Sequence, residues 1–214
     1  MRIAERCTES RMSEADTIEK LVVPVFERIY DKPLWFERAS RATKGKRKWD
    51  LEVFEKMPGE QASTNLLLAL VECKSARTTL HTNDFNQKAI DIGNLKLSPG
   101  KTVKDYLEAS VDAHGDDWLQ VWLYAHHNDF TKRTSSTKTV LTNGVQWLVF
   151  KESFFRDDHG NPPSDIEIAP QDSQIYSNDY YALINFPRNK LNASSARALS
   201  EWQKCFYALG KELV

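Results

Sequence analysis

The chain has 214 residues, of which 41% are apolar and 28% are charged, and its formal net charge is −1 at pH 7. This length and balance predict a single globular domain with a packed core and argue against a disordered chain. The longest uninterrupted apolar run, residues 66–71, is far shorter than the roughly 20 residues that a membrane-spanning helix needs, and residues 1–12 lack the apolar stretch of a secretory signal. We therefore expect a cytoplasmic protein without membrane contact, in which nucleic-acid binding would require a local basic surface.

The three cysteines, Cys7, Cys73 and Cys205, lie far apart, and the sequence has no Cys-x-x-Cys pair. An odd number of cysteines with this spacing argues against both a disulfide framework and a cysteine zinc site. Cys73 is therefore predicted to be a small buried apolar residue.

The first predicted element is an amphipathic helix of about four turns, with Ser13 as its candidate cap. It ends at Asp31-Lys32-Pro33, since proline stops a helix. Its apolar positions recur at helical spacing and are Ile18, Leu21, Val22, Val25, Phe26 and Ile29. Residues 1–12 are predicted to form a flexible arm.

Three strands are predicted next, over residues 34–38, 49–54 and 66–74, because short apolar runs are bounded there by loop-forming residues. Between the first two strands lies a run of six basic residues with no acidic residue among them, here called the basic segment: Arg38, Arg41, Lys44, Lys46, Arg47 and Lys48. We expect it to bind nucleic acid, and the alternative is a solvated loop.

Two of the six tryptophans, Trp35 and Trp49, lie near the basic segment and are the candidates for stacking on bases. The others are expected in the core because they occupy apolar positions of predicted elements. These are Trp118, Trp122, Trp147 and Trp202.

Helical turns are predicted over residues 85–92 and 103–113, and a helix over residues 116–127. Apolar runs at 139–141 and 145–150 flank Asn143-Gly144, which predicts a hairpin with a tight primed turn, in which both central residues have positive φ.

The remaining sequence predicts a long surface loop over residues 157–178 and a strand over residues 180–186. A closing helix is predicted from Asn192 to Leu209. In the expected single domain, residues 13–150 form the core and residues 151–214 a carboxy-terminal extension.

The candidate chemistry lies at the end of the third predicted strand. Alternation along the strand places Val71 and Cys73 on one face, and Glu72 with Lys74 on the other. Asp50 opens the preceding strand, and an antiparallel arrangement would bring Asp50 next to Glu72.

Two converging carboxylates favour a hard cation, Mg²⁺ or Mn²⁺, for which the backbone carbonyl of Cys73 offers a third oxygen ligand. Lys74 is then placed to orient the attacking water or to offset negative charge. The alternative is that Glu72 and Lys74 form only a solvated ion pair.

This order of elements, with Asp50, Glu72 and Lys74 at their places, resembles the PD-(D/E)xK nuclease superfamily. The resemblance implies an α/β, restriction-endonuclease-like fold, in which a central mixed β-sheet is flanked by helices. Residues 13–24 look like the opening helix of the amino-terminal nuclease domain of type I restriction enzyme motor subunits, where Glu14 matches a glutamate that approaches the metal.

Two further blocks are similar to the same domain: Gln120-Val-Trp-Leu-Tyr-Ala, and Leu141-Thr-Asn-Gly-Val-Gln-Trp147. The resemblance implies that Gln120 helps to hold the site and contacts nucleic acid. The interval between Lys74 and Gln120 is longer than the family usually shows, so Gln87 is a rival for this role.

These observations together predict a metal-dependent nuclease that cleaves DNA as an endonuclease, in a restriction, defence or mobile-element setting. A homodimer or a complex with other subunits is the expected assembly. The alternative is a catalytically silent module of the same fold that binds nucleic acid or a partner subunit.

Two other motifs are rejected. Pro99-Gly100-Lys101-Thr102 resembles the end of a P-loop, but Leu95 stands where the first glycine is needed, so we expect no nucleotide cofactor. His126 and His127 are adjacent, and neighbouring side chains on a helix diverge too far to bind one ion.

Overall fold

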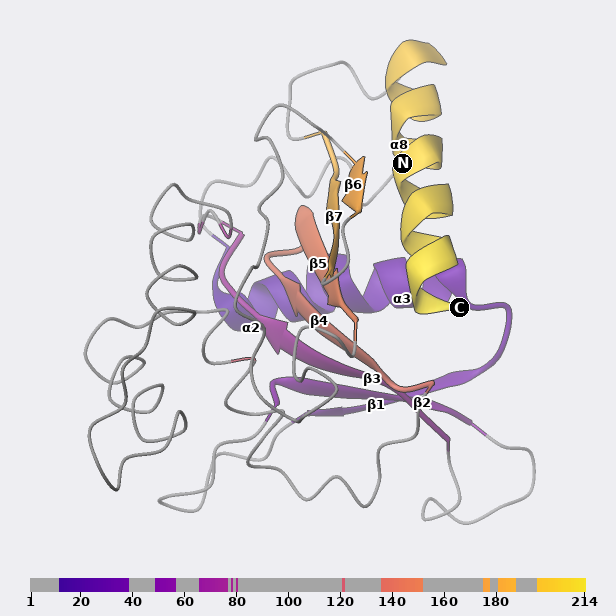
Figure 1. Cartoon of the computed structure of the whole chain (residues 1–214). Coiled ribbons are helices and arrows are strands. Elements are labelled where there is room, and N and C mark those ends of the chain that lie inside the picture. Colours follow the sequence, from indigo (N-terminus) through magenta and orange to yellow (C-terminus); the bar gives the residue numbers. More distant parts are fainter. Residues whose placement is uncertain are drawn as a thin grey trace, which may run out of the picture.

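The computed structural model describes residues 12–38, 49–56, 66–76, 78, 80, 121, 136–151, 175–177, 181–187 and 196–214. In this part of the chain, seven strands form one mixed sheet, and helices lie against it (Figure 1). The α/β class and the mixed sheet with helices that the sequence predicts are confirmed. No helix within these ranges is long and apolar enough to cross a membrane.

The strands lie side by side in the order β1-β2-β3-β4-β5-β7-β6. Their bounds are β1 Leu34–Arg38, β2 Leu51–Glu55, β3 Leu66–Cys73, β4 Lys138–Thr142, β5 Gln146–Phe150, β6 Ile175–Ser177 and β7 Tyr181–Asn185. Strands β3 and β4 are parallel, and the other neighbours are antiparallel. The long connection from β3 to β4 fits this parallel pair, which needs a crossover.

The amino-terminal helix has three parts: α2 Glu14–Thr17, the π-helical η1 Ile18–Val22, and α3 Val23–Ile29. Ser13 caps it as predicted, because its Oγ accepts from the Asp16 amide at 3.1 Å and the Asp16 carboxylate accepts from the Ser13 amide at 3.2 Å. This capping box fixes where the helix begins. Pro24 has no N–H to continue the regular ladder, and the widened π-helical turn lies just before it.

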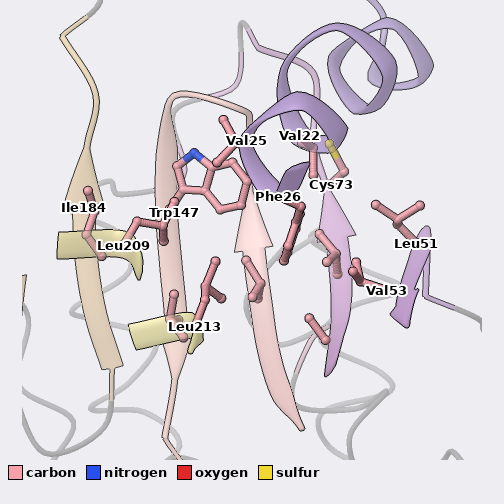
Figure 2. Close-up of a cluster of buried hydrophobic side chains, with 14 of the residues drawn as sticks. Val22, Val25, Phe26, Leu51, Val53, Cys73, Trp147, Ile184, Leu209 and Leu213 are labelled. Carbon is pink, nitrogen blue, oxygen red and sulfur yellow. The ribbon is translucent and has the colours of Figure 1, made fainter. Parts of the chain in front are cut away.

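Helix α8 spans Ala196–Leu213. The hydrophobic core lies between the sheet and the helices α3 and α8 (Figure 2). Phe26 meets Trp147 edge to face at a centroid distance of 5.8 Å, and both side chains are fully buried. Cys73 lies in this cluster, which confirms the prediction that it is a buried apolar residue. Leu213 is also buried in the core, so α8 continues four residues beyond its predicted end at Leu209.

The central part of the opposite face of the sheet is also buried. Leu148 alternates with the core residues Trp147 and Val149, and it is fully buried although it points away from the helices. Leu70 and Leu141 are buried on the same face. Strand β3 therefore brings its polar end residues to a site that apolar side chains enclose.

The β4–β5 hairpin is confirmed, but its turn differs from the predicted primed turn. Gly144 has a φ of 81°, and no other described residue has a positive φ. Asn143 acts through its side chain instead, because its Oδ1 accepts from the amides of Val145 at 3.0 Å and Gln146 at 2.7 Å. An Asx turn thus replaces the left-handed backbone that the pattern suggested.

Three further expectations are corrected. Met12 is 3% exposed and its carbonyl accepts from the Ser75 hydroxyl at 2.9 Å, so it belongs to the fold and not to the arm. The stretch predicted as a loop over 157–178 contains β6. Trp49 is 2% exposed, since it packs into the protein ahead of β2, and so cannot offer a face to a base.

Several predictions lie outside the described residues. These are the arm over 1–11, the helical turns over 85–92 and 103–113, all of the 116–127 helix except Val121, the histidine pair and the Asn192 cap. The division into one domain with an extension stays a prediction, although β6 and β7 belong to the same sheet as β1–β5.

We predict that Gly144→Ala lowers the free energy of unfolding by about 2–4 kcal/mol, since an alanine here is both strained and overpacked. A Cβ at this position would lie 2.6 Å from Leu21 Cδ1, at a φ of 81°. Urea denaturation measures the change. The control is Gly210→Ala in α8, where the Cβ would meet Ile29 Cγ2 at an ordinary 3.7 Å and where helix propensity favours alanine. Equal stability of the two variants would contradict the prediction.

Candidate active site

Asp50 lies in a bend immediately before β2, not within the strand as predicted. The β2–β3 ladder ends where Leu51 pairs with Val71, so the Cys73 amide lies beyond the last paired residues. Asp50 Oδ2 accepts from that amide at 2.8 Å. This hydrogen bond holds the Asp50 carboxylate at the end of β3.

Glu72 is 2% exposed, although it carries a carboxylate. Its Oε1 accepts from Lys74 Nζ at 2.7 Å, while its buried Oε2 meets no ordinary donor within the described structure. The carboxyl groups of Asp50 and Glu72 lie close enough to hydrogen-bond to each other when one of them is protonated. The predicted alternation is confirmed, because Glu72 and Lys74 meet while Val71 and Cys73 lie in the core on the other face.

The electrostatics of the two carboxyl groups are coupled. The pKa of Glu72 is raised to about 8, mainly by burial and also by the negative charge of the neighbouring Asp50, while the Lys74 ammonium opposes both effects. Burial also raises the pKa of Asp50, against the lowering effects of the Cys73 amide and of Lys74. The site therefore favours an added positive charge, as a proton or as a cation.

Glu14 is the first residue of α2 and is exposed. Burial raises the pKa of the Cys73 thiol above its usual range, and the charges of Asp50 and Glu14 add to this effect. The structure thus brings Glu14 into the electrostatic surroundings of Cys73, whereas the charges that act on Glu72 are those of Asp50 and Lys74.

The chain that leaves β3 is here called the exit segment, and its described residues are Ser75, Ala76, Thr78 and Leu80. On the helix side, Ser75 donates to the Met12 carbonyl, and the Ala76 amide donates to Thr17 Oγ1 at 3.1 Å. These bonds fix the first turn of α2, and with it Glu14, beside the end of β3.

On the hairpin side, Asn143 Nδ2 donates to the Thr78 carbonyl and, at 3.2 Å, to Gln146 Oε1. Gln146 Oε1 also accepts from the Leu80 amide at 3.0 Å. Sequence reasoning assigned no such role to Thr17, Asn143 or Gln146. The available signal was the polar pair Asn143 and Gln146 between apolar runs, but the Asn-Gly pattern predicts only a turn.

The structure does not bring Arg38 to the carboxylates. Arg38 pairs with Leu51 across β1 and β2, and its guanidinium bonds to Glu19 Oε1 at 3.0 Å on the face of the helix η1. Trp35 is 49% exposed on β1. The other predicted nucleic-acid-binding residues and both candidate glutamines lie outside the described residues: Arg41, Lys44, Lys46, Arg47, Lys48, Gln120 and Gln87.

A hard cation would find ligands in Asp50, Glu72 and the Cys73 carbonyl. The N–H and C=O of one extended residue face the same neighbour, so the Cys73 carbonyl lies on the side where its amide meets Asp50. In the described ranges, no group of three or more His, Cys, Asp or Glu side chains is arranged around a metal position. The fit instead rests on the buried Glu72 carboxyl, which lies within hydrogen-bonding distance of a second carboxyl group, that of Asp50.

The fold and the site define an α/β protein with two carboxylates and a lysine at one end of its sheet. Comparison of the chain with protein-family models, with curated proteins and with solved structures finds no match. The resemblance to the nuclease superfamily therefore rests on the sequence blocks described above.

We predict that metal-free protein loses stability with rising pH because of Glu72. Its folded-state pKa of about 8 lies above the ordinary value of 4.5. Its contribution to stability is thus fully present below pH 4.5 and is lost as the pH rises through about 8. Glu72→Gln cannot ionise, so its stability relative to the natural protein should increase over this range in urea denaturation with EDTA.

The matched control is Glu55→Gln, which removes a glutamate that is ion-paired with Lys32 at 2.8 Å at the opposite end of β2. A stability difference between Glu72→Gln and the natural protein that stays constant with pH would show that Glu72 titrates normally.

Proposed function

We propose that the protein is a Mg²⁺- or Mn²⁺-dependent nuclease of the PD-(D/E)xK superfamily with a restriction-endonuclease-like fold. The observation that carries the proposal is the meeting of Asp50, Glu72 and Lys74 at the end of β3, where two partly or fully buried carboxyl groups lie within hydrogen-bonding distance of each other. A purely structural ion pair would not need the second carboxylate, which makes the burial of Glu72 more costly.

Asp50, Glu72 and the Cys73 carbonyl would hold the cation. When bound, it polarises the scissile phosphate and lowers the pKa of the attacking water. Lys74 lies in contact with Glu72, and it would orient that water and offset negative charge on the phosphate. Glu14 would add negative charge at the edge of the site.

We propose DNA as the substrate, bound with the help of the basic segment, which begins at Arg38 and ends two residues before Asp50. Lys48 is two residues from Asp50, so chain connectivity alone keeps this end of the basic segment close to the proposed site. A cytoplasmic location is proposed from the lack of a long apolar run in the sequence, and a role in restriction, defence or a mobile element from the resemblance. A homodimer would supply two sites for cleavage of both strands.

Plasmid cleavage in Mg²⁺ or Mn²⁺ should fall at least a hundredfold, roughly, in Asp50→Asn and Lys74→Ala. Mn²⁺ binding, measured by calorimetry, should be lost in Asp50→Asn and kept in Lys74→Ala, since Asp50 is a proposed metal ligand and Lys74 is not. The matched control is Lys138→Ala, a lysine at the opposite end of the sheet, where it pairs with Ala69. Full cleavage by both site variants would eliminate the proposed nuclease.

A second candidate is a catalytically silent module that binds nucleic acid or a partner subunit. The observation that favours it is the direct contact of Lys74 with Glu72, which partly neutralises the site without a cation. Such a module would bind DNA in a salt-sensitive way, keep this binding in Asp50→Asn, and lose it when Arg41, Lys46 and Lys48 are neutralised.

A further inference from the structure

The exit segment is held from two sides by elements that are distant in the chain. The helix-side contacts of Ser75 and Ala76 span 63 and 59 residues, and the hairpin-side contacts of Thr78 and Leu80 span 65 and 66 residues. Four described residues directly after Lys74 are therefore tied to the tertiary structure and not only to their chain neighbours.

On the helix side, a single hydroxyl makes the connection. Thr17 is fully buried, donates through Oγ1 to the Ser13 carbonyl at 2.8 Å, and accepts from the Ala76 amide at 3.1 Å. The hydroxyl thus links the first turn of the helix to the exit segment.

On the hairpin side, the carboxamide side chain of Asn143 is fully buried and uses all of its hydrogen-bonding capacity. Its Oδ1 faces two backbone amides, which can only donate, so the orientation of the group is determined. Nδ2 must then face the Thr78 carbonyl and Gln146 Oε1, as it does.

The two sides also touch each other at Gly144. A Cβ there would lie 2.6 Å from Leu21 Cδ1 and 3.1 Å from Thr17 Cγ2, so the hairpin turn packs directly on the amino-terminal helix. The helix, the hairpin and the exit segment therefore form one packed unit around the end of β3.

We propose that Asn143 is a positioning residue that, together with Gln146 and Thr17, holds the exit segment and thereby fixes Lys74 against Glu72. Lys74 stands between β3 and the exit segment, and its own amide donates to the Thr142 carbonyl at 2.8 Å. Fixing the backbone on both sides of Lys74 limits where its long side chain can reach, since a free lysine has many rotamers. This inference rests on the proposed nuclease function, because the fixed ammonium matters for catalysis.

The test compares Asn143→Asp with the natural protein. The aspartate keeps the shape and the Oδ1 acceptor of the turn, but it cannot donate to Thr78 or Gln146. We expect faster hydrogen exchange at the Leu80 amide by NMR, and a fall in kcat of about tenfold or more with little change in the KM for DNA.

The matched control is Thr139→Val in β4, the strand that leads to Asn143. The buried Thr139 hydroxyl has no hydrogen-bond partner in the described structure, so its removal breaks no hydrogen bond. It should leave the Leu80 exchange rate and kcat as they are. A merely structural role for Asn143 would lower stability without separating kcat from KM.

A second pair of variants covers the case in which Asn143→Asp does not fold. Thr17→Ser keeps the hydroxyl and should retain slow exchange at Ala76 with normal kcat, whereas Thr17→Val should lose both.

Unchanged exchange at Leu80 in folded Asn143→Asp, or at Ala76 in Thr17→Val, would overturn the proposal that these residues hold the exit segment. Faster exchange with an unchanged kcat would overturn the positioning role and leave the nuclease intact. If the natural protein does not cleave DNA, the nuclease and the positioning role both fail, and exchange alone decides whether the segment is held.

Discussion

The arrangement at the end of β3 depends on the burial of one carboxylate, Glu72. The hydrogen bonds and opposite charges around it replace less of its lost hydration than a buried charge requires. Removing a charge from water is costly unless partners replace the lost hydration. Lys74 replaces part of it at Oε1, but Asp50 adds negative charge nearby, and the two carboxyl groups can hydrogen-bond to each other only when one of them is protonated. Such a site favours an added positive charge, which either a proton or a cation can supply.

Asp50 occupies this place because of how two strands end. The apolar pairing of Leu51 with Val71 sets the register of β2 and β3, and it leaves the Cys73 amide beyond the ladder. A backbone amide at a buried position needs an acceptor, and the Asp50 carboxylate is that acceptor. Ordinary sheet pairing thus creates the convergence of charges from which the proposed chemistry follows.

Much of this arrangement was predictable from the sequence, because short-range rules govern it. Strand alternation predicted the faces of Cys73 and Glu72, and helix-capping chemistry predicted Ser13. The role of Asn143 was not predictable, since the same Asn-Gly pair suits a primed turn, and only the tertiary position of Thr78 shows what the amide binds. The prediction that Trp49 stacks on bases was wrong for a similar reason, because its burial depends on the fold around it and not on its basic neighbours in the sequence.

The contacts around the site also differ in how far they reach along the chain. The bond from Asp50 to Cys73 spans 23 residues, whereas the bonds that hold the exit segment span 59 to 66. Contacts between distant residues cost more loop entropy and tend to form later in folding. The pair Asp50 and Glu72 can thus assemble as soon as β2 and β3 form a hairpin. The surroundings of Lys74 are completed only when the amino-terminal helix and the β4–β5 hairpin dock. The complete site therefore exists only in the fully folded protein.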